Sequence, residues 1–188
     1  MLSQKRRNLE VMFGIFDVTQ DGFITPDDFA SHADSTCAAL RLAEGSPHWH
    51  TIHRALESWW QHLRENARVT NGRIPTGECV AIMADRLVDD EPFFSSTIGP
   101  IAETIFRVLD SDGDDWISEG EFVQVYVASG LTEEVAVEAF GKIDANSDGR
   151  IGIAEFVQVV REAFTSADPD SPGAWFFGVP VRGKETAG

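Results

Sequence analysis

Oxygen-bearing side chains recur at alternate positions of residues 144–155, whose sequence is DANSDGRIGIAE. A tight loop with this spacing turns every second side chain inward, where about six to eight oxygens can surround a hard cation such as Ca²⁺. The expected ligands are the side chains of Asp144, Asn146, Asp148 and Glu155 and the backbone carbonyl of Arg150. Gly149 supports the sharp turn at position 6, because only glycine adopts positive φ freely. We call these residues loop 4, and they predict a calcium site.

Residues 110–121, loop 3, repeat the pattern with one departure. The expected ligands are the side chains of Asp110, Asp112, Asp114 and Glu121 and the backbone carbonyl of Trp116. Position 6 holds Asp115 instead of glycine, and aspartate tolerates positive φ better than most residues but still at a cost. Four acidic ligands attract cations, so this loop is also expected to bind; an inactive loop is the alternative.

Residues 17–28, loop 1, depart from the pattern twice. The expected ligands are the side chains of Asp17, Thr19, Asp21 and Asp28 and the backbone carbonyl of Phe23. Thr19 replaces an Asp or Asn, and Asp28 replaces the final Glu. The shorter Asp28 is less able to offer both oxygens, which favours the six-coordinate geometry that Mg²⁺ requires. We therefore expect Mg²⁺ to compete with Ca²⁺ at this site; an inactive loop is again the alternative.

Residues 67–78, loop 2, keep the turn but lack ligands. Asn71, Gly72 and Glu78 occupy positions 5, 6 and 12, whereas Ala67 and Val69 put no side-chain oxygen at positions 1 and 3. This loop is predicted not to bind metal. Its expected role is structural, with Ile74 pairing with Ile24 of loop 1 in a short two-stranded contact.

Apolar residues at helical spacing flank the loops. Before loop 1, for example, Leu9, Met12, Phe13 and Phe16 recur at intervals of three and four residues. The expected fold is all-α: four helix–loop–helix units in two pairs, forming one compact body with a short two-stranded contact between paired loops.

The chain order predicts two halves and a tail. We expect residues 1–91 to form the first pair, residues 92–100 a linker, residues 101–166 the second pair and residues 167–188 a tail docked on the core. The tail carries an aromatic cluster around Trp175, which would promote aggregation if it were exposed. A groove between the two halves is its expected position.

Composition limits the partners. The net charge of −16 opposes binding to nucleic acids or anionic membranes. Only two cysteines are present, and no apolar run is long enough to span a membrane, so a cytoplasmic monomer is expected. No nucleophile with a base, phosphate loop or catalytic metal spacing was found, so the chain is not expected to be an enzyme.

The loops match the calcium-loop motif of EF-hand proteins, completely so in loop 4. Four such repeats, of which the second lacks ligand residues, resemble the sarcoplasmic calcium-binding protein family, and its bacterial calerythrin-like members in particular. The final Asp28 of loop 1 and the tail around Trp175 are similar to that family too. The resemblance implies a compact body, calcium binding at loops 1, 3 and 4, and a buffering role.

Three functions are compatible with calcium binding. Sensors open on binding and expose a methionine-rich groove, whereas buffers barely open. The chain has three methionines against thirteen phenylalanines and five tryptophans, and a rigid aromatic core adapts less readily to targets. The primary hypothesis is therefore an intracellular calcium buffer. A calcium sensor with a protein target is the alternative, and a carrier of a hydrophobic small molecule is a third.

Overall fold

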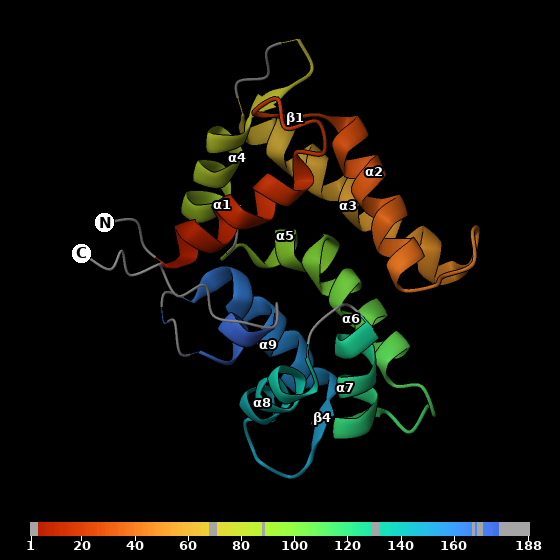
Figure 1. Ribbon diagram of the computed structural model, residues 1–188. Helices are drawn as coiled ribbons and strands as arrows, with labels where there is room; N and C mark the ends of the chain where they lie inside the picture. Colours follow the sequence, from red (N-terminus) through yellow and green to blue (C-terminus); the bar gives the residue numbers. More distant parts are fainter. Residues whose placement is uncertain are drawn as a thin grey trace. The chain divides into compact units, whose positions relative to one another are not determined.

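A computed structural model describes residues 4–67, 71–87, 89–128, 132–166, 168 and 171–176 of the 188-residue chain. The chain divides into two compact units, Met1–Val108 and Leu109–Gly188. Both consist of α-helices with a two-stranded antiparallel sheet between paired loops, as expected (Figure 1). Among the described residues, no helix is long and apolar enough to cross a membrane.

The first unit contains two helix–loop–helix units and a helical continuation. Its helices are α1 (Gln4–Phe16), α2 (Pro26–Ala39), α3 (Pro47–Asn66), α4 (Thr76–Ile82), extended by a π-helical turn (Met83–Leu87), then α5 (Glu91–Ser96) and α6 (Ile98–Leu109). Strands β1 (Phe23–Ile24) and β2 (Ile74–Pro75) pair with Ile24 opposite Ile74, which confirms the predicted contact between loops 1 and 2.

Capping residues fix where the long helices begin. The Thr25 hydroxyl accepts a hydrogen bond from the Asp28 N–H, and Pro26 fills the first position of α2, where no N–H is needed. The Ser46 hydroxyl accepts from the Trp49 N–H ahead of α3 in the same way. These caps hold the helices that leave loop 1 and enter loop 2.

Aromatic rings fill the core of the first unit. The ring of Phe16 lies 4.9 Å from Phe29 and 5.6 Å from Trp59, centroid to centroid, and Trp59 lies 5.7 Å from Phe93. The buried indole N–H of Trp59 donates to the sulfur of Met83 at 3.3 Å. The core is therefore closely interlocked, as the aromatic composition predicts.

Residues 92–100 differ from the expected linker, because they form most of α5 and the first residues of α6. The Asp90 carboxylate caps α5 through the Phe93 N–H at 2.9 Å, and Phe93 and Phe94 are buried. Prolines and serines in this stretch resemble a loop in sequence, but the cap and the burial of two aromatic rings favour a short helix.

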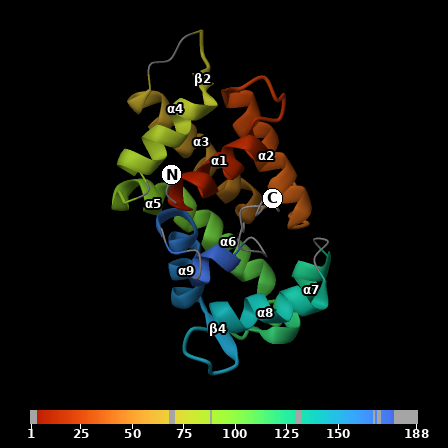
Figure 2. The same cartoon turned by 60° about the vertical axis from the view of Figure 1, so that its left-hand side comes forward.

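The second unit repeats the paired arrangement. It contains β3 (Trp116–Ser118), α7 (Glu119–Ala128), α8 (Glu133–Ile143), β4 (Arg150–Gly152), α9 (Ile153–Thr165) and a 3₁₀ turn, η2 (Pro172–Trp175). Strands β3 and β4 pair with Ile117 opposite Ile151 (Figure 2 shows β4 between α8 and α9 along the chain). The buried rings of Phe122, Phe140 and Phe156 occupy its core.

The described part of the tail, Ser171–Phe176, packs on the second unit itself. The turn η2 lies against α8 and α9, and the Tyr126 hydroxyl donates to the Phe176 carbonyl at 2.7 Å. Gly173 leaves no room for a side chain, since an added Cβ would lie 2.3 Å from the Ala163 nitrogen. The rest of the tail, residues 177–188, lies outside the described residues.

Candidate metal sites

The first aspartate of loops 1, 3 and 4 accepts hydrogen bonds from the backbone of its own loop. Asp17, Asp110 and Asp144 are only 8%, 6% and 6% exposed. In each loop one oxygen accepts the N–H of position 5, at 3.1–3.2 Å, and the other accepts the N–H of position 6, at 2.9–3.1 Å. These bonds wrap the chain around a carboxylate, which is the arrangement that the alternating ligand pattern requires.

The last carboxylate of each loop reaches back to its start. The backbone N–H of position 2 donates to Glu121 at 2.9 Å in loop 3, to Glu155 at 3.0 Å in loop 4 and to Asp28 at 3.3 Å in loop 1. The bond is longest for Asp28, the shorter side chain. Even so, in all three loops the last carboxylate contacts the residue that follows the first aspartate.

Loop 3 gathers its carboxylates most closely among the described residues. Single oxygens of Asp110, Asp112 and Asp114 lie within 4.8 Å of one another. Such a set of oxygens suits a hard divalent cation, because carboxylates are the ligands that Ca²⁺ and Mg²⁺ prefer. Three of the four side chains that the sequence predicts for this loop thus lie close together.

Two serines hold the remaining ligand of loop 3. The Ser118 N–H and hydroxyl donate to one oxygen of Glu121 at 2.9 and 2.7 Å, and the Ser111 N–H and hydroxyl donate to the other at 2.9 Å each. Partial burial raises the pKa of Glu121, but the hydrogen bonds from Ser118 and Ser111 outweigh it and lower the pKa to about 2. These hydrogen bonds thus hold Glu121 in its ionised form.

Loop 1 shows how threonine and aspartate fit its two unusual positions. The Thr19 hydroxyl turns towards Asp17, 3.4 Å from its carboxylate. The second oxygen of Asp28 accepts both the N–H and the hydroxyl of Thr25, at 2.9 and 2.6 Å. Both oxygens of Asp28 therefore accept hydrogen bonds, which leaves fewer of their lone pairs available to a cation.

Loop 4 has no hydroxyl at the equivalent point. Position 9 is Gly152, and α9 begins after it without a side-chain cap. The Asn146 side-chain oxygen accepts the Asp148 N–H at 2.8 Å, and Asp148 accepts the Arg150 N–H at 3.1 Å. The second oxygen of Glu155 consequently faces no serine or threonine competing for it.

Loop 2 serves as a support for loop 1. The Thr76 N–H donates to the Gly22 carbonyl at 3.0 Å, alongside the Ile24–Ile74 pair. Asn71 and Gly72 keep positive φ values of 54° and 75°. Ala67 offers no oxygen, and Val69 lies outside the described residues, so the prediction that this loop lacks metal rests on its sequence.

Sequence reasoning missed the residues that hold the last carboxylates. Thr25 and Ser118 stand three residues before Asp28 and Glu121, a spacing typical of a capping box. That spacing can be read in the sequence. Ser111 had no comparable signal, because its contact with Glu121 depends on the closed shape of the loop.

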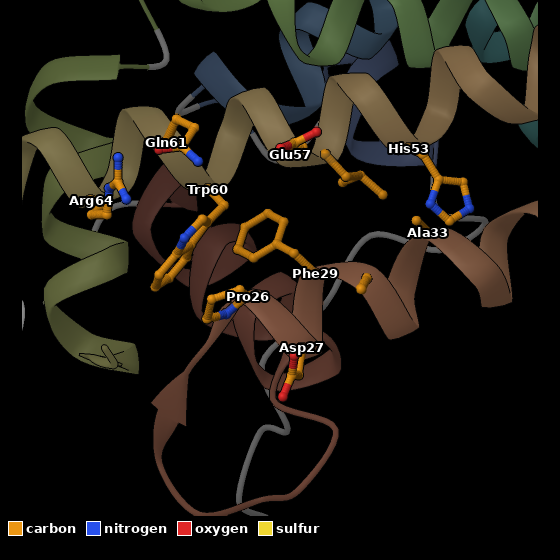
Figure 3. Close-up of a pocket in the computed structure, with 11 residues that line it drawn as sticks. Pro26, Asp27, Phe29, Ala33, His53, Glu57, Trp60, Gln61 and Arg64 are labelled. Atoms are coloured by element: carbon orange, nitrogen blue, oxygen red, sulfur yellow. The ribbon is translucent and has the colours of Figure 1, made fainter. Parts of the chain in front are cut away.

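A groove between α2 and α3 is a further concave feature of the described residues. Its volume is about 460 Å³ (Figure 3). The buried side chains of Phe29, Ala33, Leu56 and Trp60 line it together with exposed charged residues that include Asp27, Glu57 and Arg64. This mixture of apolar and charged lining differs from the all-oxygen loops.

Comparisons with known proteins agree with the loop geometry. Residues 102–161 match the family model of an EF-hand domain pair, and residues 9–31 match an EF-hand model. Calerythrin from Saccharopolyspora erythraea is 24% identical over 156 residues, which cover 82% of this chain and 88% of that protein.

Solved structures of two other proteins are similar to this chain over most of its length. A calcium-binding protein of Streptomyces coelicolor, described in connection with prokaryotic calcium-mediated regulation, is 28% identical with a TM-score of 0.63, over 86% of this chain and 98% of that one. A sarcoplasmic calcium-binding protein from amphioxus is 18% identical with a TM-score of 0.68, over 95% and 98%. The second likeness concerns the fold alone.

Proposed function

The chain belongs to the EF-hand calcium-binding proteins, and we propose that it acts as a calcium buffer in the cytoplasm. The observation that carries this proposal is the position of Ser171–Phe176. The chain places its own aromatic segment on α8 and α9, so the second unit already has an occupant where a sensor would offer a surface to a target.

Three sites are proposed, in loops 1, 3 and 4. Loop 4 is expected to bind most tightly, because its turn glycine is in place and Glu155 has no hydroxyl competing for its second oxygen. Loop 3 follows, since a non-glycine residue stands at its turn and Ser118 occupies one oxygen of Glu121. Loop 1 is weakest for Ca²⁺, and Asp28 makes Mg²⁺ competitive there.

The proposal also covers oligomeric state, catalysis, compartment and partners. We propose a monomer without catalytic activity, whose ligands are calcium ions. The buried thiols of Cys37 and Cys79 are compatible with a reducing compartment. The acidic surface of the chain disfavours nucleic acid and anionic membranes as partners.

A sensor is the second candidate. The Streptomyces coelicolor protein is described in connection with calcium-mediated regulation, and it resembles this chain over nearly its whole length. The same tail segment would then act as a removable cover. A carrier function is the third candidate, for which the groove between α2 and α3 is the supporting observation.

Titration of Ca²⁺ at constant Mg²⁺, followed by a dye that fluoresces on apolar surfaces, separates these functions. A buffer closes around its metal, so dye fluorescence should fall or stay low as the sites fill. The variant Gly173→Ala serves as the positive control, because a Cβ there collides with the backbone of α9 and should lift the tail. Gly141→Ala in α8 is the matched control, since nothing lies within 4 Å of its added Cβ.

A rise in dye fluorescence with Ca²⁺ in the wild-type chain would overturn the buffer assignment and favour the sensor. Saturable binding of an apolar chromophore, abolished by a bulky substitution such as Ala33→Trp in the groove, would favour the carrier. Calorimetry in the same experiment counts the sites, and fewer than three would correct the proposed number.

A further inference from the structure

Two arginines lie over aromatic rings of the neighbouring loop at the same distance. The guanidinium carbon of Arg150 lies 4.0 Å from the centre of the Trp116 ring, and that of Arg73 lies 4.0 Å from the centre of the Phe23 ring. Contacts of this geometry are cation–π interactions. One of the two contacts lies beside each two-stranded sheet.

The four residues occupy the same loop position. Position 7 is Phe23 in loop 1, Arg73 in loop 2, Trp116 in loop 3 and Arg150 in loop 4. Each pair thus joins an aromatic residue in the first loop to an arginine in the second. Position 7 is also the position whose backbone carbonyl is an expected metal ligand, so these side chains belong to residues whose main chain enters the site.

The strand register explains how Arg150 reaches its ring. Arg150 pairs with Ser118, and Trp116 pairs with Gly152, so the guanidinium crosses the sheet diagonally. Gly152 leaves space for the indole, because an added Cβ would lie 3.0 Å from a Trp116 ring carbon. The ring of Trp116 therefore packs closely against Gly152 and is covered by the guanidinium of Arg150.

From this arrangement we infer that Arg73 and Arg150 are positioning residues for calcium binding. Each fixes the aromatic residue of the neighbouring loop, and so the carbonyl at position 7 of loop 1 or loop 3. The inference rests on the proposed sites in those loops. It also gives loop 2, which lacks ligands, a structural role: Arg73 contacts the Phe23 ring and the Thr76 N–H donates to the carbonyl of the preceding residue, Gly22.

Charge alone would predict the opposite effect of these arginines. A positive side chain beside a cation site repels the cation, so removing it should tighten binding. The nearby Asp148 carboxylate only partly offsets this, since its oxygen lies 3.9 Å from Arg150 Nε on a pair that is well exposed. The sign of the change in affinity therefore distinguishes positioning from repulsion.

Calorimetry with Ca²⁺ on Arg150→Met and Arg73→Met tests the inference, because methionine keeps an unbranched side chain without the charge. We expect about a two- to fivefold weaker affinity for loop 3 in the first variant and for loop 1 in the second, as a cation–π contact of ordinary strength implies. Arg54→Met, on the exposed face of α3, removes the same charge away from the loops and should leave both affinities unchanged.

The amide signals of position 6 assign each change to its loop. The N–H groups of Gly22, Asp115 and Gly149 each donate to the first aspartate of their own loop, so their NMR shifts report loops 1, 3 and 4 separately. Thermal unfolding in chelator confirms that the variants fold. Arg150→Lys keeps the charge and can still place a cation over the ring, so its affinity should lie between those of the wild type and Arg150→Met.

Unchanged or tighter binding in both methionine variants, with folding intact, would overturn the inference and leave repulsion as the dominant effect of these arginines. That result would not touch the calcium sites themselves. Loss of the proposed function is a different outcome: the wild-type chain would then show fewer than three calcium-dependent amide shifts.

Discussion

Loops 3 and 4 follow one backbone course with different residues at its two strained points. Positions 4 and 6 have positive φ in both loops: 75° at Gly113 and 67° at Asp115 in loop 3, and 58° at Ser147 and 84° at Gly149 in loop 4. Each loop has one glycine for the two positions. Loop 4 has it at position 6, as the motif expects, and loop 3 has it at position 4.

The difference shows that the turn is imposed by the first aspartate and not by glycine. Asp110 accepts three backbone N–H groups, those of Gly113, Asp114 and Asp115, and these bonds hold Asp115 in a conformation that costs a non-glycine residue energy. A glycine at position 6 lowers the cost of the turn, but the hydrogen bonds to the aspartate set its shape.

The two loops also differ in the hydrogen bonds that their position 12 carboxylates accept. In loop 3 the serines at positions 2 and 9 hold both oxygens of Glu121, whereas in loop 4 position 9 is Gly152. A bidentate ligand must offer both oxygens, so loop 3 has to rearrange more of its hydrogen bonding than loop 4 on binding.

Removing the last carboxylate is the largest change that the comparison predicts. Glu155→Gln should weaken calcium binding at loop 4 by about 100-fold or more, because the site loses a charge and a bidentate ligand. Glu121→Gln should weaken calcium binding at loop 3 by less, since both oxygens of Glu121 already accept hydrogen bonds from serines. Calorimetry combined with the amide signals of Gly149 and Asp115 measures the two losses.

Glu78→Gln is the matched control, because it makes the same change at position 12 of loop 2. No calcium affinity should change in this variant. An equal or larger loss at loop 3 than at loop 4 would contradict the argument from the free oxygen of Glu155, and a loss on changing Glu78 would show that loop 2 takes part in binding.

The candidate ligands of these loops can be proposed from the sequence because their spacing is local. Asp110, Asp112 and Asp114 stand at fixed intervals and lie close together, and Glu121 accepts the N–H of Ser111, the residue after Asp110. The pairing of Ile24 with Ile74 was predictable for a similar reason, since two equivalent loops offer the same apolar residue at position 8.

Features that depend on contacts between segments were not predictable in this way. The helix at Glu91–Ser96 was missed, because its turn-forming residues outweigh, in sequence, the Asp90 cap and the burial of Phe93 and Phe94. The contact of Ser111 with Glu121 and the stacking of Arg150 on Trp116 need the closed loop and the strand register, which no interval along the chain reveals.

Exchanging the turn residue should have a moderate effect. Asp115→Gly relieves positive φ and is expected to stabilise the second unit by about 1 kcal/mol and to tighten loop 3. Gly113→Ala puts strain on position 4 and should destabilise it by a similar amount. Denaturant unfolding in chelator, followed by calcium titration, measures both; weaker binding in Asp115→Gly would contradict this account of the turn.

The smallest expected effect concerns pH. Glu121 has a folded-state pKa of about 2 against an ordinary value of 4.5, because hydrogen bonds from Ser118 and Ser111 outweigh the opposing effect of burial. A lowered pKa means that the ionised group stabilises the folded chain above about pH 4.5, and that this contribution disappears as the pH falls towards 2.

The contribution should be below about 1 kcal/mol, since the carboxylate is largely exposed to screening solvent. Unfolding of the metal-free chain at several pH values should therefore show a slightly steeper acid destabilisation in the wild type than in Ser118→Ala, which lacks one of the hydroxyl donors. Glu138→Gln, an exposed change on α8, is the control and should not alter the slope. Identical slopes for the wild type and Ser118→Ala would mean that the serine orders Glu121 without stabilising its charge, and the difference between loops 3 and 4 would then be one of geometry alone.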